Sequence, residues 1–264
     1  MRVRWCLCGW LVFIFKNFFF ERGLFIFYTM MDYGQDTLFG KKVISTIGYD
    51  EQEMIRDILY LHARGKHIDC DPTYSIGNFY KNGVPKPKYK FDKFPQLPDV
   101  IEATADNLPM ENESCEVIMF DPPFILGDAE REQDIIGDRF TRFKEFSDLQ
   151  AMYSASLKEF ARVLKQGGII IFKCQDTISG GKNHFTHCWT MYEAIQQGFY
   201  PKDMFILFAK NRLNDGREQQ HGRKYHCYYW VFEKRACRVD YLNAATSDIQ
   251  GEGKKEIFKN ENVA

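Results

Sequence analysis

The sequence has no excess of charge of either sign. It contains 35 Lys and Arg against 36 Asp and Glu, which gives a formal net charge of −1 over 264 residues. The first thirty residues are net basic, so the remainder is slightly more acidic than the whole chain. Total charge therefore does not indicate a nucleic-acid partner, and any phosphate-binding surface has to come from a local group of basic residues.

Paired cysteines are also missing. None of the eight cysteines belongs to a CxxC pair, the spacing typical of structural zinc sites. Several fall inside apolar runs that we interpret as buried strands, which predicts reduced thiols in a cytoplasmic protein. His184, His187 and Cys188 have a loosely metal-like spacing, but no second ligand cluster accompanies them. We therefore predict no metal site.

The apolar run near the N-terminus is too short to cross a membrane. Trp5–Phe15 has 11 residues and is followed by Lys16, whereas a spanning helix needs about 20. Residues 1–30 can be interpreted as an anchor, or as upstream sequence translated before a start at Met30 or Met31. We favour the second interpretation and predict no membrane association. We expect a non-native or disordered extension over 1–30, one catalytic domain over 31–240 and a polar tail over 241–264.

Four short apolar runs, each closing on an aspartate, follow a predicted helix. Apolar residues recur at helical spacing from Asp50 to Ala63, and Gly65 ends that pattern. The four strand-like runs are His67–Asp71, Tyr89–Asp92, Val100–Asp106 and Val117–Asp121. In an open parallel sheet, ligands bind outside the carboxyl ends of the strands, so this row of acids predicts the rim of a binding site.

The rest of the chain alternates helices and strands before closing on a hairpin. A helical pattern over 149–164 is followed by Gly167-Gly168 and a strand over 169–174. A second helix over 186–197 precedes strands over 199–209 and 225–232. We predict an α/β fold, a Rossmann-like doubly wound sheet of seven strands, mostly parallel with an antiparallel hairpin edge.

The tetrapeptide Asp121-Pro122-Pro123-Phe124 directly follows one of the predicted strands. Two consecutive prolines hold the backbone extended and remove two amide donors, so this loop presents hydrogen-bond acceptors. Acceptors are what methylation of an exocyclic amino group needs, because its lone pair is delocalised into the ring until something accepts its hydrogens. The carboxylate and a proline-fixed carbonyl can do so most strongly in the transition state, and Phe124 can stack on the base.

In this loop the sequence resembles the amino-methylating DNA methyltransferases, which modify adenine N6 or cytosine N4. Their catalytic loop begins with Asp or Asn, followed by two prolines and an aromatic residue, after the fourth strand of a seven-stranded methyltransferase sheet. The resemblance covers roughly residues 69–233. It implies S-adenosyl-L-methionine as the cofactor, DNA as the substrate and Asp121, Pro122, Pro123 and Phe124 as catalytic residues.

The same resemblance implies a set of cofactor-binding residues. The segment that begins Asp71-Pro72-Thr73 is similar to the loop after the first strand in that family, although Gly77 is its only glycine. This departure leaves the contacts to the methionine moiety open. Asp92 corresponds in place to the acid that binds the ribose, and Asp106-Asn107 to the segment that contacts the cofactor's adenine.

Substrate contacts are predicted from the segments that follow the later strands. Lys173, Asp176 and Lys182 should lie beside the catalytic loop, while Arg223 and Lys224 belong to the densest basic segment, residues 210–226. Each of these segments can equally be a solvated surface. The segment 125–146 is either a mobile lid over a flipped base or a surface loop.

We predict an S-adenosylmethionine-dependent DNA amino-methyltransferase, with adenine favoured over cytosine only because adenine N6 enzymes are the more frequent members of the family. The absence of a Pro-Cys dipeptide argues against cytosine C5 chemistry, which needs a thiolate nucleophile. RNA or protein amino-methylation by the same loop is one alternative. Another is a non-catalytic nucleic-acid-binding subunit. No separate recognition domain is evident, so sequence specificity can also come from a partner.

Overall fold

The protein is described by a computed structural model over residues 43–127, 142–209 and 221–235. The predicted extension over 1–30 and the predicted tail over 241–264 lie outside these ranges. The helices are α2 (Glu51–His62), α3 (Phe146–Val163) and α4 (Thr186–Gln196). The strands are β1 (Ile47–Gly48), β2 (Cys70–Asp71), β3 (Tyr89–Asp92), β4 (Ile101–Glu102), β5 (Cys115–Phe120), β6 (Leu164–Cys174), β7 (Thr177–Ser179), β8 (Lys182–His184), β9 (Phe199–Phe208) and β10 (His226–Lys234).

Eight strands form one sheet in the order β1-β9-β10-β6-β5-β2-β3-β4. All neighbouring strands are parallel except β10, which runs antiparallel to both β6 and β9. This is a mostly parallel, Rossmann-like doubly wound sheet, as the sequence predicts. It differs from the prediction in one respect. The two-residue strand β1 pairs with β9, so the sheet has eight strands and the β9–β10 hairpin is not its edge.

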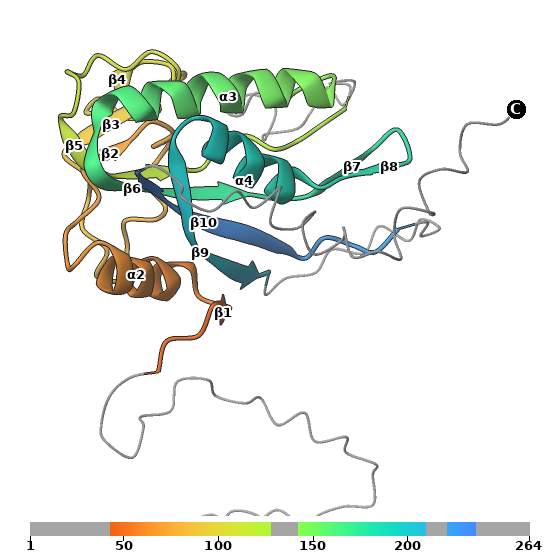
Figure 1. Cartoon of the computed structure of the whole chain (residues 1–264), viewed down its shortest axis with the longest axis horizontal. Coiled ribbons are helices and arrows are strands. Elements are labelled where there is room, and N and C mark those ends of the chain that lie inside the picture. Colours follow the sequence, from red (N-terminus) through yellow and green to blue (C-terminus); the bar gives the residue numbers. More distant parts are fainter. Residues whose placement is uncertain (1–42, 128–141, 210–220, 236–264) are drawn as a thin grey trace, which may run out of the picture. The chain divides into compact units, whose positions relative to one another are not determined.

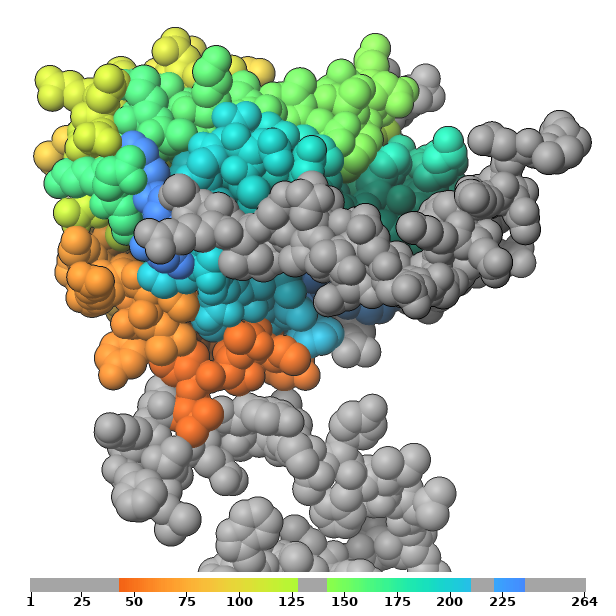
Figure 2. All heavy atoms as spheres, viewed as in Figure 1, coloured from red at the N-terminus to blue at the C-terminus, as the bar shows by residue number. Residues whose placement is uncertain are grey.

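Helices cover both faces of the sheet (Figure 1). Strand residues alternate between two buried clusters, so that Val117 and Met119 face α2 whereas Ile118 and Phe120 face α3. In the space-filling view the side chains of α3 and α4 lie against one another over their face of the sheet (Figure 2). This two-sided burial explains why the strands are almost continuously apolar in sequence.

Helix α2 forms where its periodicity predicts. Its N-cap is Asp50, whose carboxylate accepts the Glu53 N–H at 2.9 Å. Its buried residues are Met54, Ile55, Ile58 and Leu59, the face that the sequence pattern predicts. The chain then turns at Gly65, which adopts φ of 75°.

Helix α3 ends one residue earlier than predicted, and the glycine pair is not what stops it. The chain leaves the helix at Leu164 and enters β6 directly. Between β5 and β6 the register shifts, because Cys115 pairs with Leu164 but Val117 pairs with Ile169. Gly167-Gly168 lies in the bulge that absorbs the extra residues.

The connection from β2 to β3 contains no helix, although doubly wound folds commonly have one there. Residues 72–88 form a series of turns, and their aromatic side chains Tyr74, Phe79 and Tyr80 are buried against the α2 face of the sheet. Tyr74 and Tyr80 stack with ring centroids 5.2 Å apart. Aromatic burial thus replaces helical packing in this segment.

A small hairpin of β7 and β8 was not predicted as strands. It forms a separate two-stranded sheet in which Ser179 pairs with Lys182 across Gly180-Gly181. Of the helices in the described part of the chain, none is both long and apolar enough to span a lipid bilayer.

The bulge between β5 and β6 provides a test of the packing. A Cβ atom at Gly168 would lie 2.9 Å from the Lys165 carbonyl oxygen and 3.0 Å from that of Glu116. Because backbone must then shift, we expect Gly168→Ala to lower the free energy of unfolding by about 1–3 kcal/mol. Gly222→Ala, where nothing lies within 4 Å, should change it by less than about 0.5 kcal/mol. Equal stability of both variants in urea denaturation would contradict this packing.

Candidate functional site

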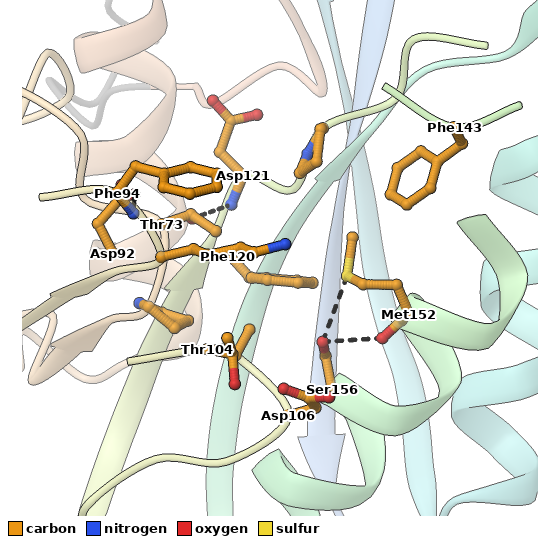
Figure 3. Close-up of a pocket in the computed structure, with 14 residues that line it drawn as sticks. Thr73, Asp92, Phe94, Thr104, Asp106, Phe120, Asp121, Phe143, Met152 and Ser156 are labelled. Carbon is orange, nitrogen blue, oxygen red and sulfur yellow. Dashed lines mark hydrogen bonds between the residues drawn. The ribbon is translucent and has the colours of Figure 1, made fainter. Parts of the chain in front are cut away.

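A cavity of about 220 Å³ lies at the carboxyl ends of the parallel strands. The chain runs from β2 outward to β3 and β4, then returns to the other side of β2 with β5. A crevice at such a reversal is where open α/β sheets bind ligands. The lining residues are Pro72, Thr73, Asp92, Lys93, Phe94, Thr104, Ala105, Asp106, Phe120, Asp121, Pro123, Phe143, Met152 and Ser156 (Figure 3).

Four of the seven residues predicted to bind a cofactor line this cavity. They are Pro72, Thr73, Asp92 and Asp106. Asp92 is the last residue of β3 and Asp106 follows β4, and both line the same cavity as Phe94 and Phe120. Such a lining can hold a ligand with hydroxyl or amino donors and a flat apolar part.

Asp71, predicted as a cofactor-orienting acid, lies behind the cavity wall and is fully buried. Its Oδ1 accepts the Thr73 N–H at 2.8 Å and the Thr73 hydroxyl at 3.2 Å, and its Oδ2 accepts the Tyr80 hydroxyl at 2.7 Å. Burial raises the pKa of Asp71 to about 7, although these hydrogen bonds oppose the rise. In this structure Asp71 organises the loop.

Asp92 has both a structural role and access to the cavity. Its Oδ2 accepts the Ser75 N–H at 2.7 Å and its Oδ1 accepts the Phe94 N–H at 2.8 Å. These bonds tie the loops after β2 and β3 together and turn the Phe94 ring towards the cavity. Each carboxylate oxygen retains a lone pair for a further donor.

Gly77 and Asn107 are not among the residues that line the cavity. Gly77 adopts φ of 71°, and a Cβ atom there would lie 2.5 Å from the Tyr74 hydroxyl oxygen. The packing of Tyr74 therefore requires a glycine at position 77. Asn107 closes a turn by donating its N–H to the Thr104 carbonyl at 3.0 Å, and its side chain is exposed.

The Asp-Pro-Pro-Phe loop is held from both sides. The Asp121 N–H donates to the Thr73 hydroxyl at 2.9 Å, and the Tyr153 hydroxyl donates to the Pro123 carbonyl at 3.2 Å. Asp121 and Pro123 line the cavity, whereas Pro122 is buried and Phe124 packs against the core beneath α3. The loop is thus fixed at the end of β5, where Asp121 and Pro123 face the cavity.

The carboxylate of Asp121 has one engaged and one unengaged oxygen. Oδ2 lies 3.3 Å from the Lys173 Nζ, whereas Oδ1 is buried and has no hydrogen-bond partner among the described residues. In Figure 3 the carboxyl group points away from Thr104, Asp106 and Ser156 at the far end of the cavity. Burial raises the pKa of Asp121, the Lys173 ammonium lowers it, and the Glu51 carboxylate raises it further.

The residues predicted to bind substrate are not brought to one place. Lys173 is paired with Glu51 and Asp121, and Asp176 is buried, where its Oδ1 contacts the His187 Nδ1 at 2.6 Å. Although burial opposes it, His187 holds the pKa of Asp176 below its usual range. Lys182 is exposed on β8.

The predicted basic segment is described only in part. Arg223 and Lys224 precede β10, and the Lys224 ammonium lies 5.9 Å from the centre of the Phe185 ring. Lys210, Arg212 and Arg217 of that segment, and most of the predicted lid, lie outside the described residues.

The sequence did not identify two of the groups beside Asp121. Glu51 opens α2 and contacts Lys173 at 2.9 Å, and the Tyr229 hydroxyl donates to the same Glu51 oxygen. No local pattern marks them, because their partners are 122 and 178 residues distant in sequence. Across residues 43–127, 142–209 and 221–235, no three His, Cys, Asp or Glu side chains are grouped to hold a metal ion.

Comparison with known proteins gives similarity in structure only. No family model and no curated protein sequence matches this chain. A protein from Thermus thermophilus provisionally named a DNA modification methylase, solved with S-adenosyl-L-methionine, aligns at 14% identity over 55% of this chain and 58% of that one, with a TM-score of 0.34. The alignment thus spans little more than half of that protein.

Two further structures align over more of their length. One, from Thermotoga maritima, is named a possible histamine N-methyltransferase, and it aligns at 16% identity over 70% of this chain and 88% of its own, with a TM-score of 0.39. Another, from Galdieria sulphuraria, is provisionally named a sarcosine dimethylglycine methyltransferase, with 11% identity, coverage of 70% and 85%, and a TM-score of 0.44. Similarity at this level does not indicate what this chain acts on.

The buried acid behind the cavity predicts a pH-dependent stability. Because the folded chain binds the Asp71 proton more tightly than the unfolded chain, the stabilisation is complete below about pH 4 and is lost as pH rises through about 7. We expect Asp71→Asn to lack this loss, so that its free energy of unfolding relative to wild type rises by about 2 kcal/mol from pH 5 to pH 8. Urea denaturation at both pH values measures this difference.

Asp99→Asn serves as the control for that measurement. Asp99 is exposed and paired with Lys90, which holds its pKa below the usual range, so it stays ionised in both states over this interval. The difference in free energy of unfolding between Asp99→Asn and wild type should therefore be the same at pH 5 and pH 8. If this difference is also constant for Asp71→Asn, the raised pKa of Asp71 is contradicted.

Proposed function

We propose that this protein is an S-adenosylmethionine-dependent methyltransferase that methylates an exocyclic amino nitrogen of a base in DNA, with adenine N6 as the favoured acceptor. The observation that carries the proposal is the buried, unpartnered Oδ1 of Asp121, a residue that lines the cavity. A buried acceptor without a donor is costly unless a ligand supplies the donor. An amino hydrogen of the target base would satisfy it.

The cavity fits the proposed cofactor in its chemistry. Asp92 and Asp106 offer carboxylate oxygens to ribose hydroxyls and to the adenine amino group, and the rings of Phe94 and Phe120 offer apolar walls to a purine. Carboxylates at the rim also favour a cationic ligand. When bound, the cofactor would supply a methyl group activated by its sulfonium, with S-adenosylhomocysteine as the leaving group, and the methylated nitrogen would then lose one proton to solvent.

The protein's part in the reaction is to hold the amino group and accept its hydrogens. Oδ1 of Asp121 accepts one hydrogen, which returns the nitrogen lone pair from the ring to the attack direction. This interaction strengthens as the nitrogen becomes tetrahedral and positive, so it lowers the barrier more than it tightens substrate binding. The bonds from Asp121 to Thr73 and from Tyr153 to Pro123 keep the loop in place.

Phe124 is proposed to stack on the target base. Its side chain is partly buried and follows the two prolines, so a base reaching Asp121 would meet it. No covalent bond forms between enzyme and base in this scheme. None of the cysteines Cys70, Cys115, Cys174, Cys188 or Cys227 is among the residues that line the cavity.

The proposal is tested by transfer of labelled methyl groups from S-adenosylmethionine to unmethylated duplex DNA, single-stranded DNA and total RNA, with nucleoside analysis of the product. We expect N6-methyladenine in DNA. Asp121→Ala should lower kcat/KM by about 10²–10³-fold because the acceptor is lost, whereas Asp121→Asn should retain more activity because its amide oxygen still accepts.

Glu116→Gln is the matched control for these variants. It removes an ion-paired acid at the opposite end of the same strand, where Glu116 contacts Lys66 and Lys165, so activity should be unchanged. Detection of N4-methylcytosine would show that the acceptor base is cytosine. Label found only in RNA would show that the substrate is RNA. Cofactor binding without transfer to any of the three substrates would reject the proposal for the chain on its own.

A further inference from the structure

Strand periodicity places a lysine beside the proposed catalytic acid. Along β5 and β6, every second side chain faces α2. On the β5 side Met119 is followed two residues later by Asp121. On β6 Ile171 is followed two residues later by Lys173. Phe120 pairs with Phe172 in the parallel ladder, which brings the next residues of the two chains side by side. On the other flank, Tyr229 of β10 pairs with Lys173.

Helix α2 adds a second acid to this row. Glu51 is its first residue, and its Oε1 lies 2.9 Å from the Lys173 Nζ, while the Asp121 Oδ2 lies 3.3 Å from the same nitrogen. We refer to Asp121, Lys173 and Glu51 as the acid–lysine–acid cluster. One ammonium thus bridges a carboxylate of the proposed catalytic loop and a carboxylate of a helix that lies outside the resemblance.

The cluster is shielded from water on several sides. The side chains of Lys173, Asp121 and Glu51 are only 15%, 23% and 24% exposed. The Phe79 and Tyr229 rings flank the ammonium, with their centres 5.0 Å and 5.7 Å from Nζ, and the Tyr229 hydroxyl donates to Glu51. At this burial, charge interactions are much stronger than on the surface.

Two carboxylates share one cation in this cluster, so Lys173 is the group that offsets the negative charge of both acids. Burial alone would lower the pKa of Lys173, but Asp121 and Glu51 raise it above its usual value. The other titratable groups that interact with Asp121 are Asp71, Tyr153, Cys227 and Tyr229. All of these are acids or neutral donors, and Lys173 supplies the positive charge beside Asp121.

We infer that Glu51 and Lys173 are a positioning pair for Asp121. Glu51 and Tyr229 hold the ammonium, and the ammonium binds Oδ2 of Asp121, which leaves Oδ1 turned to the incoming amino group. This inference rests on the proposed function, since it assigns the pair a part in presenting that acceptor. A buried ion pair contributes little to stability on balance, so a role in the site is the better reason for its presence.

Removing each partner should affect the pKa of Asp121 differently. Lys173→Met keeps most of the length of the side chain but removes the charge, so burial and Glu51 should raise the pKa of Asp121. Glu51→Gln removes the carboxylate that raises this pKa, so the pKa should fall or stay unchanged. Lys173→Arg keeps the charge and should return the pKa towards its wild-type value.

The test combines two measurements on the full chain. The first is the titration of the Asp121 carboxyl carbon by NMR, without cofactor or DNA, in wild type and the three variants. The second is the pH profile of kcat for methyl transfer to DNA. We expect Lys173→Met to lower kcat at pH 7 by about 10- to 100-fold and to move the acidic limb upward by about one pH unit.

Glu51→Gln should lower kcat without moving that limb upward, because it loosens Lys173 but does not favour protonation of Asp121. Lys173→Arg should restore the limb, with only part of the rate. Lys165→Met is the matched control. It removes a lysine from the same strand that is paired with Glu116 at 3.5 Å, and it should change neither measurement.

An Asp121 titration that is the same in wild type and Lys173→Met would overturn the inference, as would equal upward shifts of the limb in Lys173→Met and Glu51→Gln. A rise of the Asp121 pKa in Lys173→Met that Lys173→Arg reverses supports it. The NMR titration needs no methyl transfer. If the wild-type chain methylates nothing, the proposed function fails, and the titration still decides whether this pair controls Asp121.

Discussion

The parallel pairing of β2 with β5 is the interaction on which the site depends. These two-residue and six-residue strands are neighbours in the sheet although they are separated by more than forty residues of chain. Their pairing sets the loops that follow them side by side, and the Thr73 hydroxyl then joins the two, since it donates to Asp71 and accepts from the Asp121 N–H. The strand order fixes the remaining distances, because β3 and β6 flank this pair and supply Asp92 and Lys173.

The site contains two buried acids with different partners. Asp71 is enclosed by donors and by the aromatic residues of the 72–88 segment, and no cation pairs with it among the residues described, so burial raises its pKa to about 7. Burial raises the pKa of Asp121 as well, but the Lys173 ammonium opposes this rise. One lysine thus distinguishes an acid that organises a loop from an acid that is paired with a cation.

Much of the fold follows from local sequence patterns. The apolar periodicity of α2 and the bounds of β3 are as predicted, and β5 ends one residue before the predicted Asp121, because each is dictated by residues that are close in sequence. Strands β1, β7 and β8 were not predicted. They have two or three residues each, and their existence depends on pairing partners rather than on their own composition.

The site could be predicted only in outline. The motif and the strand-ending acids located the cavity, since carboxyl ends of parallel strands share one edge of a sheet. Lys173 lies beside the catalytic loop, as predicted, but its partner Glu51 on a distant helix could not be predicted. For Gly77 the structure adds a packing reason, because Tyr74 requires its small size. Both findings depend on tertiary packing, which sequence spacing does not report.

A crystal structure of the chain with bound S-adenosylhomocysteine tests the role of Asp121 most directly. We expect adenine between Phe94 and Phe120 and the sulfur at the Asp121 end of the cavity. There, an amino nitrogen bonded to Oδ1 of Asp121 would lie within about 3.5 Å of the transferred methyl group. A ligand bound elsewhere, or one whose sulfur faces the Asp106 end, would show that Asp121 does not present its free oxygen to the reacting nitrogen.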